Sequence, residues 1–250
     1  MPQLLQALVG AVAAGWKVPK SLHFIAVGGA KIAPSWIDKA QSLGLPVYEG
    51  YGLSECASVV CLNTPVSARP GSVGRPLPHA RVSIEDGHVV VSEQVFLGYL
   101  NDADNRLPQR VDTGDLGHFD EDGYLYLDGR AKQILVSSFG RNIDPEWVES
   151  ECVSGPVIQQ CVVFGEAQPY CVALLSPRQA QATTSEIQAW IDQVNQRLPD
   201  YARINAWSLL PQPLSLSNGL LTANGRPKRG PIVQQYADMI EGLFPLESST

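Results

Sequence analysis

The strongest constraint on the fold is an apolar run that ends in two adjacent glycines. Residues 22–27 lead directly into Gly28 and Gly29, and residues 34–43 then have the pattern of a helix. A second strand begins at Val47. Strand, turn, helix, turn and strand in this order predict an open α/β sheet with a glycine-rich turn at a strand's carboxyl end. Ligands of such sheets bind at that end, so the turn is a candidate binding element.

The middle of the chain has a different pattern. Between residues 65 and 129, short β-type runs are separated by two Glu-Asp-Gly turns at 85–87 and 121–123, which predicts hairpins in a small β-rich subdomain. We therefore expect residues 1–131 to consist of an α/β portion at 1–64 and the β-rich subdomain at 65–131.

The remainder, residues 132–250, is expected to be a separate α+β domain. Asp144 before Pro145 predicts a helix start, since aspartate accepts free backbone N–H bonds and proline suits a first turn. Strands are expected at 158–164 and 170–175, and a helix at 185–197 with Ser185 and Gln188 as its capping box. The predicted fold class is thus α/β plus α+β.

Charge and composition exclude several functions. The chain has 18 Lys and Arg against 25 Asp and Glu, a net charge of -7, so neither nucleic acid nor an anionic bilayer attracts it. Its most apolar stretch, residues 4–16, is shorter than the roughly 20 residues of a membrane-spanning helix and lacks the basic start of a signal peptide. The five cysteines are odd in number and show no Cys-x-x-Cys spacing, which argues against a disulfide framework or zinc site and favours the cytoplasm.

Four short clusters have residue types suited to nucleotide chemistry. The turn 28–30 exposes backbone to a flat ring or phosphate, and the loop 51–55 combines an aromatic ring, a hydroxyl and a carboxylate that suits Mg²⁺. The loop 112–115 has a carboxylate able to accept two ribose hydroxyls, and 129–132 adds an arginine and a lysine. Taken singly, each also has a structural explanation as a tight turn, a solvated turn or a surface ion pair.

Together and in this order, the clusters resemble the adenylate-forming superfamily of acyl-CoA synthetases, nonribosomal adenylation domains and beetle luciferases. The resemblance extends through Gly140, Pro145 and Glu149, which match the segment that opens the C-terminal domain of that superfamily. The stretch 218–229 is similar to the long-chain fatty acyl-CoA synthetase branch.

The resemblance implies a role for each matching residue. Tyr51 would stack on adenine, Ser54 would contact the α-phosphate, Glu55 would bind Mg²⁺, and Asp115 would hold the ribose hydroxyls with help from Arg130. Lys132 would be the pivot of the C-terminal domain. The remaining nucleotide- and cofactor-binding positions are Gly28, Gly29, Ala30, Glu49, Gly50 and Gly52, with Gly140 beside the pantetheine of coenzyme A.

Two departures from the superfamily stand out. Nothing in residues 1–27 resembles its Ser/Thr/Gly-rich phosphate loop, so the chain is expected to correspond to the C-terminal half of a synthetase. Apolar surface around residues 1–60 would then be uncovered, which predicts a homodimer or a complementing N-terminal half. At the position of the lysine used in adenylation stands Arg226, whose planar fork replaces a point charge.

The expected function is ATP- and Mg²⁺-dependent activation of a carboxylic acid, expected to be a fatty acid, followed by transfer to CoA. Turnover by this chain alone is not expected. A noncatalytic fragment that binds a nucleotide or partner, and a ligase that loads an acyl carrier protein, are the alternatives.

Overall fold

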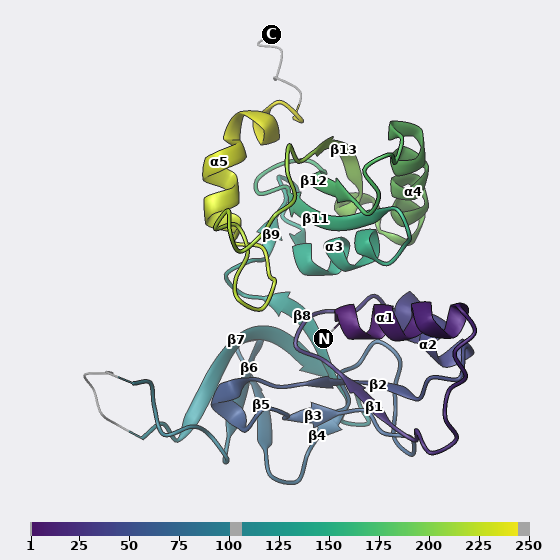
Figure 1. Ribbon diagram of the computed structural model, residues 1–250. Helices are drawn as coiled ribbons and strands as arrows, with labels where there is room; N and C mark the ends of the chain where they lie inside the picture. The colour runs from purple at the N-terminus through teal and green to yellow at the C-terminus, as the bar shows by residue number, and fades with distance from the viewer. Residues whose placement is uncertain (1, 101–106, 245–250) are drawn as a thin grey trace. The chain divides into compact units, whose positions relative to one another are not determined.

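The computed structural model describes residues 2–100 and 107–244 (Figure 1). The chain divides into two compact units, residues 1–132 and 133–250, and each is described by itself. The mixture of an α/β portion, a β-rich portion and an α+β portion predicted from the sequence is confirmed. In the described ranges, no helix has both the length and the apolar character needed to cross a membrane.

The first unit begins with an α/β portion. Helix α1 (Pro2–Ala13) precedes the parallel strands β1 (Ile25–Val27) and β2 (Val47–Tyr51), which are joined through α2 (Pro34–Ser42). Leu5 and Val9 lie one helical turn apart in α1 and are buried in one cluster with Val47. The apolar run near the N-terminus is therefore a core helix. Strand β1 is shorter than predicted, since it begins at Ile25.

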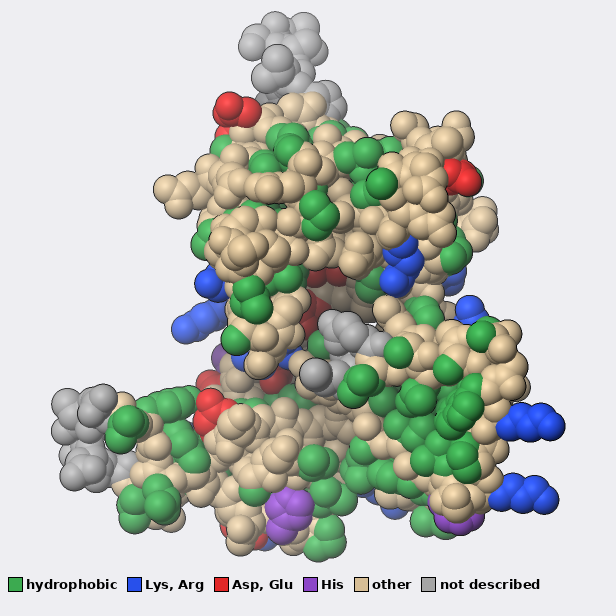
Figure 2. Space-filling model, viewed as in Figure 1, with side chains coloured by type: hydrophobic (Ala, Val, Ile, Leu, Met, Phe, Trp, Pro, Cys, Tyr) green, Lys and Arg blue, Asp and Glu red, His purple; other side chains and the backbone are tan. Residues whose placement is uncertain are grey.

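Some apolar surface of this portion is uncovered. Leu4, Trp16 and Phe24 are 64%, 41% and 39% exposed, and the Phe24 ring stacks on Tyr48 with ring centroids 5.3 Å apart. Figure 2 shows hydrophobic side chains gathered on this face of the first unit. Trp16 is partly exposed because it follows the end of α1 and lies outside the packed helix face.

A short sheet joins the α/β portion to the β-rich portion. Strand β2 pairs antiparallel with β3 (Cys61–Leu62), and β3 pairs with β4 (Arg75–Pro76), so the sheet order is β1-β2-β3-β4. A four-stranded antiparallel sheet follows: β5 (Arg81–Glu85), β6 (His88–Ser92), β7 (Arg110–Phe119) and β8 (Leu125–Arg130). Both predicted Glu-Asp-Gly turns are confirmed, with Gly87 and Gly123 at φ +82° and +79°.

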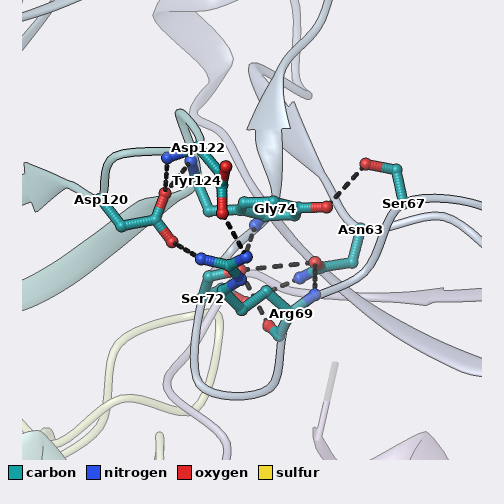
Figure 3. Close-up of polar contacts among 8 residues, drawn as sticks. All are labelled: Asn63, Ser67, Arg69, Ser72, Gly74, Asp120, Asp122 and Tyr124. Carbon is teal, nitrogen blue, oxygen red and sulfur yellow. Dashed lines mark hydrogen bonds and ion pairs between the residues drawn. The ribbon is translucent and has the colours of Figure 1, made fainter.

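Polar contacts around Arg69 hold these two sheets together (Figure 3). The Arg69 guanidinium, in the β3–β4 connection, donates to Asp120 and Asp122 in the β7–β8 turn at 2.5 and 2.6 Å. It also lies over the ring of Tyr124, 4.7 Å from the centroid. From the same connection, the Asn63 amide donates to the backbone oxygen of Ser72 at 2.7 Å. This network fixes the β3–β4 connection relative to the β7–β8 turn.

The second unit is an α+β sandwich. A hairpin of β9 (Leu135–Val136) and β10 (Asn142–Ile143) precedes α3 (Pro145–Val153), and a sheet of order β11-β12-β13 forms the centre. The bounds of that sheet and its other helices are β11 (Ile158–Phe164), β12 (Cys171–Pro177), α4 (Thr184–Arg197), β13 (Ile204–Leu209) and α5 (Arg229–Glu241).

Alternation along the central strands places helices on both faces of this sheet. Cys161 and Val163 are buried in the cluster that contains α3 and α4 residues, whereas Val162 and Phe164 belong to the cluster that contains α5 residues. Strands buried on both faces are expected to be continuously apolar, as β12 is.

The caps show one correct and one wrong prediction. Asp144 caps α3 as predicted, since its carboxylate accepts from the backbone of Glu146 at 3.0 Å. The capping box of α4 consists of Thr183 and Glu186 instead of Ser185 and Gln188. Thr183 has extended backbone and is followed three residues later by a glutamate that bonds back to it, which is the better match to the motif.

Candidate nucleotide site

Close backbone packing explains two of the predicted glycines. A Cβ atom on Gly28 would lie 2.5 Å from the backbone oxygen of Gly50, and one on Gly50 would lie 2.7 Å from the Leu62 side chain. Gly29 has φ +83°, which favours glycine. Ala30 completes the bend before α2. The turn at the carboxyl end of β1 therefore leaves no room for a side chain at Gly28 and has a backbone conformation that favours glycine at Gly29.

The loop after β2 is folded tightly. A Cβ atom on Gly52 would lie only 1.9 Å from the backbone oxygen of Ser58, and Ala57 and Ser58 have φ +55° and +78°. The loop closes where the Val60 amide donates to the Tyr51 backbone oxygen at 2.7 Å. This folding leaves Ser54 exposed and Glu55 partly buried in a 3₁₀ turn.

Tyr51, Asp115 and Arg130 converge, although they lie far apart in the sequence. The Tyr51 hydroxyl donates to Asp115 Oδ2 at 2.5 Å, and Arg130 Nε lies 2.9 Å from Asp115 Oδ1. Asp115 on β7 and Arg130 on β8 are direct cross-strand partners. The Asp115 side chain is 10% exposed and that of Arg130 is 40% exposed, so the carboxylate lies at the base of the cluster.

The backbone around Asp115 is shaped by its neighbours. Thr113 Oγ1 donates to the Val89 backbone oxygen at 2.8 Å and accepts from the Asp115 amide at 3.1 Å. Asp112 accepts from the Gly114 amide at 2.8 Å, and Gly114 has φ +70°. The Thr-Gly-Asp motif is thus an irregularity within β7 that turns Asp115 toward Tyr51.

Burial and charge determine two protonation states near this cluster. Burial, followed by the neighbouring Asp115 carboxylate, raises the pKa of Tyr51 well above its usual value, so its hydroxyl remains a donor. Burial raises the pKa of Glu49 to about 7, and the charge of Lys31 opposes this shift. Glu49 can therefore hold a proton near neutral pH.

The remaining predicted residues lie at separate places. Glu55 accepts a hydrogen bond from the hydroxyl of Tyr99. Lys132 is exposed at the end of the first unit. It follows Ala131, whose amide donates to the Gly114 oxygen at 2.9 Å. Gly140 has φ +70° in the β9–β10 hairpin loop of the second unit. The structure thus brings Tyr51 and Arg130 together at the Asp115 carboxylate and packs Gly28 against Gly50. Glu55, Lys132 and Gly140 lie in their own local settings.

Arg226 lies in a tight loop of the second unit. Its amide donates to Thr222 Oγ1 at 3.0 Å, and its backbone oxygen accepts from the Thr222 amide at 2.8 Å. The loop leads into α5, where the Arg229 guanidinium pairs with Glu149 and donates to the Val163 oxygen at 2.7 Å. The Arg226 loop is therefore anchored to α3 and β11.

Sequence reasoning assigned no role to Thr113 or Tyr99. Thr113 lies within the predicted loop 112–115, and a hydroxyl two positions before Asp115 was a signal that could have identified it. Tyr99 is 44 positions from Glu55, and nothing in its local sequence pairs it with that carboxylate. Only the folded loop brings the two together.

Comparison with known proteins gives a consistent result. The model of the AMP-binding enzyme family matches residues 1–100, and that of the AMP-binding enzyme C-terminal domain matches residues 132–247. A long-chain-fatty-acid–CoA ligase of Mycobacterium tuberculosis is 30% identical over 88% of this chain and 42% of its own length. A 2-succinylbenzoate–CoA ligase of Lactococcus lactis is 35% identical over 58% of this chain and 34% of its own length.

Solved structures share the fold. An anthranilate CoA ligase in complex with anthranoyl-AMP has a TM-score of 0.73 at 20% identity, with 92% of this chain and 48% of that chain covered. The O-succinylbenzoate coenzyme A synthetase of Bacillus subtilis, in complex with AMP, has a TM-score of 0.72 at 24% identity, with 91% and 48% covered. The chain thus spans about half the length of these proteins or less. With its two family models and its fold in agreement, the chain belongs to the AMP-binding enzyme family, the adenylate-forming superfamily.

Proposed function

We propose that this chain supplies part of the nucleotide site and the mobile C-terminal domain of an ATP-dependent acid–thiol ligase. The ligase activates a carboxylic acid as an acyl-adenylate and transfers the acyl group to CoA. The observation that carries this proposal is the convergence of Tyr51 and Arg130 on the Asp115 carboxylate. The CoA ligases to which the chain is similar support the reaction class.

Asp115 is suited to hold a ribose. Each carboxylate oxygen has two acceptor positions, and in this structure Tyr51 uses one on Oδ2 and Arg130 one on Oδ1. One position on each oxygen is left for the two ribose hydroxyls. The bond from Tyr51 also fixes the orientation of the ring on which adenine would stack.

The phosphate end of the nucleotide would lie at the loop after β2. The exposed Ser54 hydroxyl would contact the α-phosphate, and Glu55 would ligate Mg²⁺. Within the described ranges, no three His, Cys, Asp or Glu residues are grouped to hold a metal. A lone carboxylate fits Mg²⁺ that takes its other ligands from water and nucleotide phosphates. The metal would neutralise phosphate charge during attack by the acid.

The second half-reaction would use the C-terminal domain. Lys132 would be the pivot between the adenylation and thioester-forming arrangements, and Gly140 would lie beside the pantetheine. Hinges of this kind are a few residues between rigid bodies that absorb the backbone change. Lys132 is exposed, and it directly follows Ala131, whose amide donates to the Gly114 oxygen. This position supports the assignment.

The finer assignments rest on the relatives and on the apolar face of the first unit. We propose a fatty acid as the substrate, with CoA or an acyl carrier protein as acceptor. We propose the cytoplasm as the location, in which the five free buried thiols would persist.

The exposed Leu4, Trp16 and Phe24 would be covered by a second copy or by a segment equivalent to the other half of the relatives. Binding of a nucleotide without ligation is the competing proposal.

ATP–pyrophosphate exchange tests the proposal. We expect no exchange from this chain alone, and acid-dependent exchange when the N-terminal half of the Mycobacterium tuberculosis relative is added, strongest with fatty acids in a panel of carboxylic acids. The Asp115→Asn variant is the matched control, and its mixture should be inactive. Binding of ATP without exchange in every mixture would favour the noncatalytic alternative.

A second experiment tests Arg226. Replacing it with lysine restores the compact ammonium of the superfamily, so we expect the complemented Arg226→Lys variant to release pyrophosphate roughly tenfold faster or more. Thioester formation from an added acyl-adenylate should be unchanged, because that step does not use this residue. An unchanged rate of pyrophosphate release would show that arginine serves equally well.

A further inference from the structure

The proposed metal ligand Glu55 is held at two points by the segment 96–99. The Tyr99 hydroxyl donates to Glu55 Oε1 at 2.8 Å, and the Phe96 amide donates to the Glu55 backbone oxygen at 2.7 Å. The Phe96 and Tyr99 rings pack edge to face, with centroids 4.7 Å apart and an interplanar angle of 70°. Both the backbone and the carboxylate of Glu55 are therefore fixed by one small unit of structure.

The donor to this carboxylate is neutral. In the described part of the chain, no lysine, arginine or histidine forms an ion pair with Glu55, and Tyr99 bonds only to Oε1. A phenol orients the carboxylate without neutralising its charge, whereas a cation would compete with a metal.

We infer that Tyr99 is a positioning residue that holds one oxygen of Glu55 so that the other faces the metal of the bound nucleotide. The inference rests on the proposed function of Glu55. Carboxylates that ligate metals are commonly held by such hydrogen bonds, and loss of the partner typically lowers metal affinity by about 10- to 100-fold. Tyr99 is 63% exposed, so the hydroxyl can be removed without leaving a cavity in the core.

The test is calorimetric titration of the full chain with ATP, with and without Mn²⁺, and with AMP. In the wild type, Mn²⁺ should tighten ATP binding. In Tyr99→Phe, which keeps the ring against Phe96, the factor by which Mn²⁺ increases the affinity for ATP, the metal-dependent gain, should fall by about tenfold or more. The affinities for AMP and metal-free ATP should be unchanged. In a Glu55→Gln background, Tyr99→Phe should have no further effect.

Tyr126→Phe is the matched control, since Tyr126 lies in the same unit, stacked on His118, and has no part in the proposed site. It should retain the full metal-dependent gain. A gain of wild-type size in Tyr99→Phe would overturn the inference and leave the proposed function intact. If the wild type binds ATP without any metal dependence, the proposed role of Glu55 is overturned, and this inference with it. If the wild type binds no nucleotide, the whole proposed site is overturned, and this inference with it.

Discussion

Replacing Arg229 with methionine is expected to destabilise the second unit by about 3–5 kcal/mol at pH 8. Arg229 pairs with Glu149, and their side chains are 19% and 12% exposed. The pair joins α5 to α3, and both residues also bond to the backbone of Val163 in β11. Methionine keeps the volume of the arginine stem but leaves the Glu149 carboxyl in the interior without its counter-charge.

The loss should depend on pH in a defined direction. Burial raises the pKa of Glu149 to about 7, and the charge of Arg229 opposes this rise, so Arg229→Met should raise that pKa further. Because the folded-state pKa lies above the unfolded value, protonation of Glu149 favours the folded state. The loss is therefore largest above the raised pKa of the variant, becomes smaller as pH falls from there toward 7, and no longer changes below about pH 7, where Glu149 is protonated in both folded proteins.

Urea unfolding at pH 8 and pH 5.5 measures this effect. The double variant Glu149→Gln with Arg229→Met is the matched control, because the amide oxygen can still accept from Val163 while neither charge is present. Its stability should return most of the way to the wild-type value at pH 8. A single variant with the same loss at both pH values would show that the ion pair is not the cause.

Replacing Asp115 with asparagine is expected to lower the affinity for AMP by about 100-fold. Hydrogen bonds to a charged group contribute about 1.5–3 kcal/mol each, and the amide offers only one acceptor atom to Tyr51, Arg130 and two ribose hydroxyls. Isothermal titration with AMP measures the loss. Asp128→Asn on neighbouring β8, where the carboxylate is 52% exposed and pairs with His118, should bind AMP like the wild type.

Urea unfolding separates this effect from misfolding. The asparagine has the shape of the aspartate and can still accept the Tyr51 bond. Arg130 loses its charged partner but is 40% exposed, so water can solvate it, and the unfolding midpoint of Asp115→Asn should stay close to that of the wild type. An AMP affinity that falls only in step with stability would argue against a direct role in binding.

Much of the site could be predicted because its residues lie in short motifs at strand ends. The apolar run before Gly28 and the strand start at Val47 predicted the sheet that carries Tyr51. Residues 112–115 were expected to form a loop, which is wrong, because Asp115 lies within β7, opposite Arg130 on β8. The clash that a side chain on Gly28 or Gly52 would create was not visible in the sequence, because it depends on segments that fold back from elsewhere.

Other features depended on packing that a local pattern does not encode. Ser185 and Thr183 both suit a cap, and only the return bond from Glu186 decided between them. Trp16 is apolar yet 41% exposed, because α1 ends before it. Tyr99 became part of the site through a single long-range hydrogen bond.

The central claim is that the Asp115 carboxylate receives the ribose hydroxyls of AMP, and a comparison of two ligands on two proteins tests it most directly. The affinities of AMP and of 2′,3′-dideoxy-AMP are measured by titration for the wild type and for Asp115→Asn. We predict that the wild type prefers AMP by about 100-fold and that the variant binds both ligands almost equally. An equal preference for AMP in the two proteins would contradict the claim.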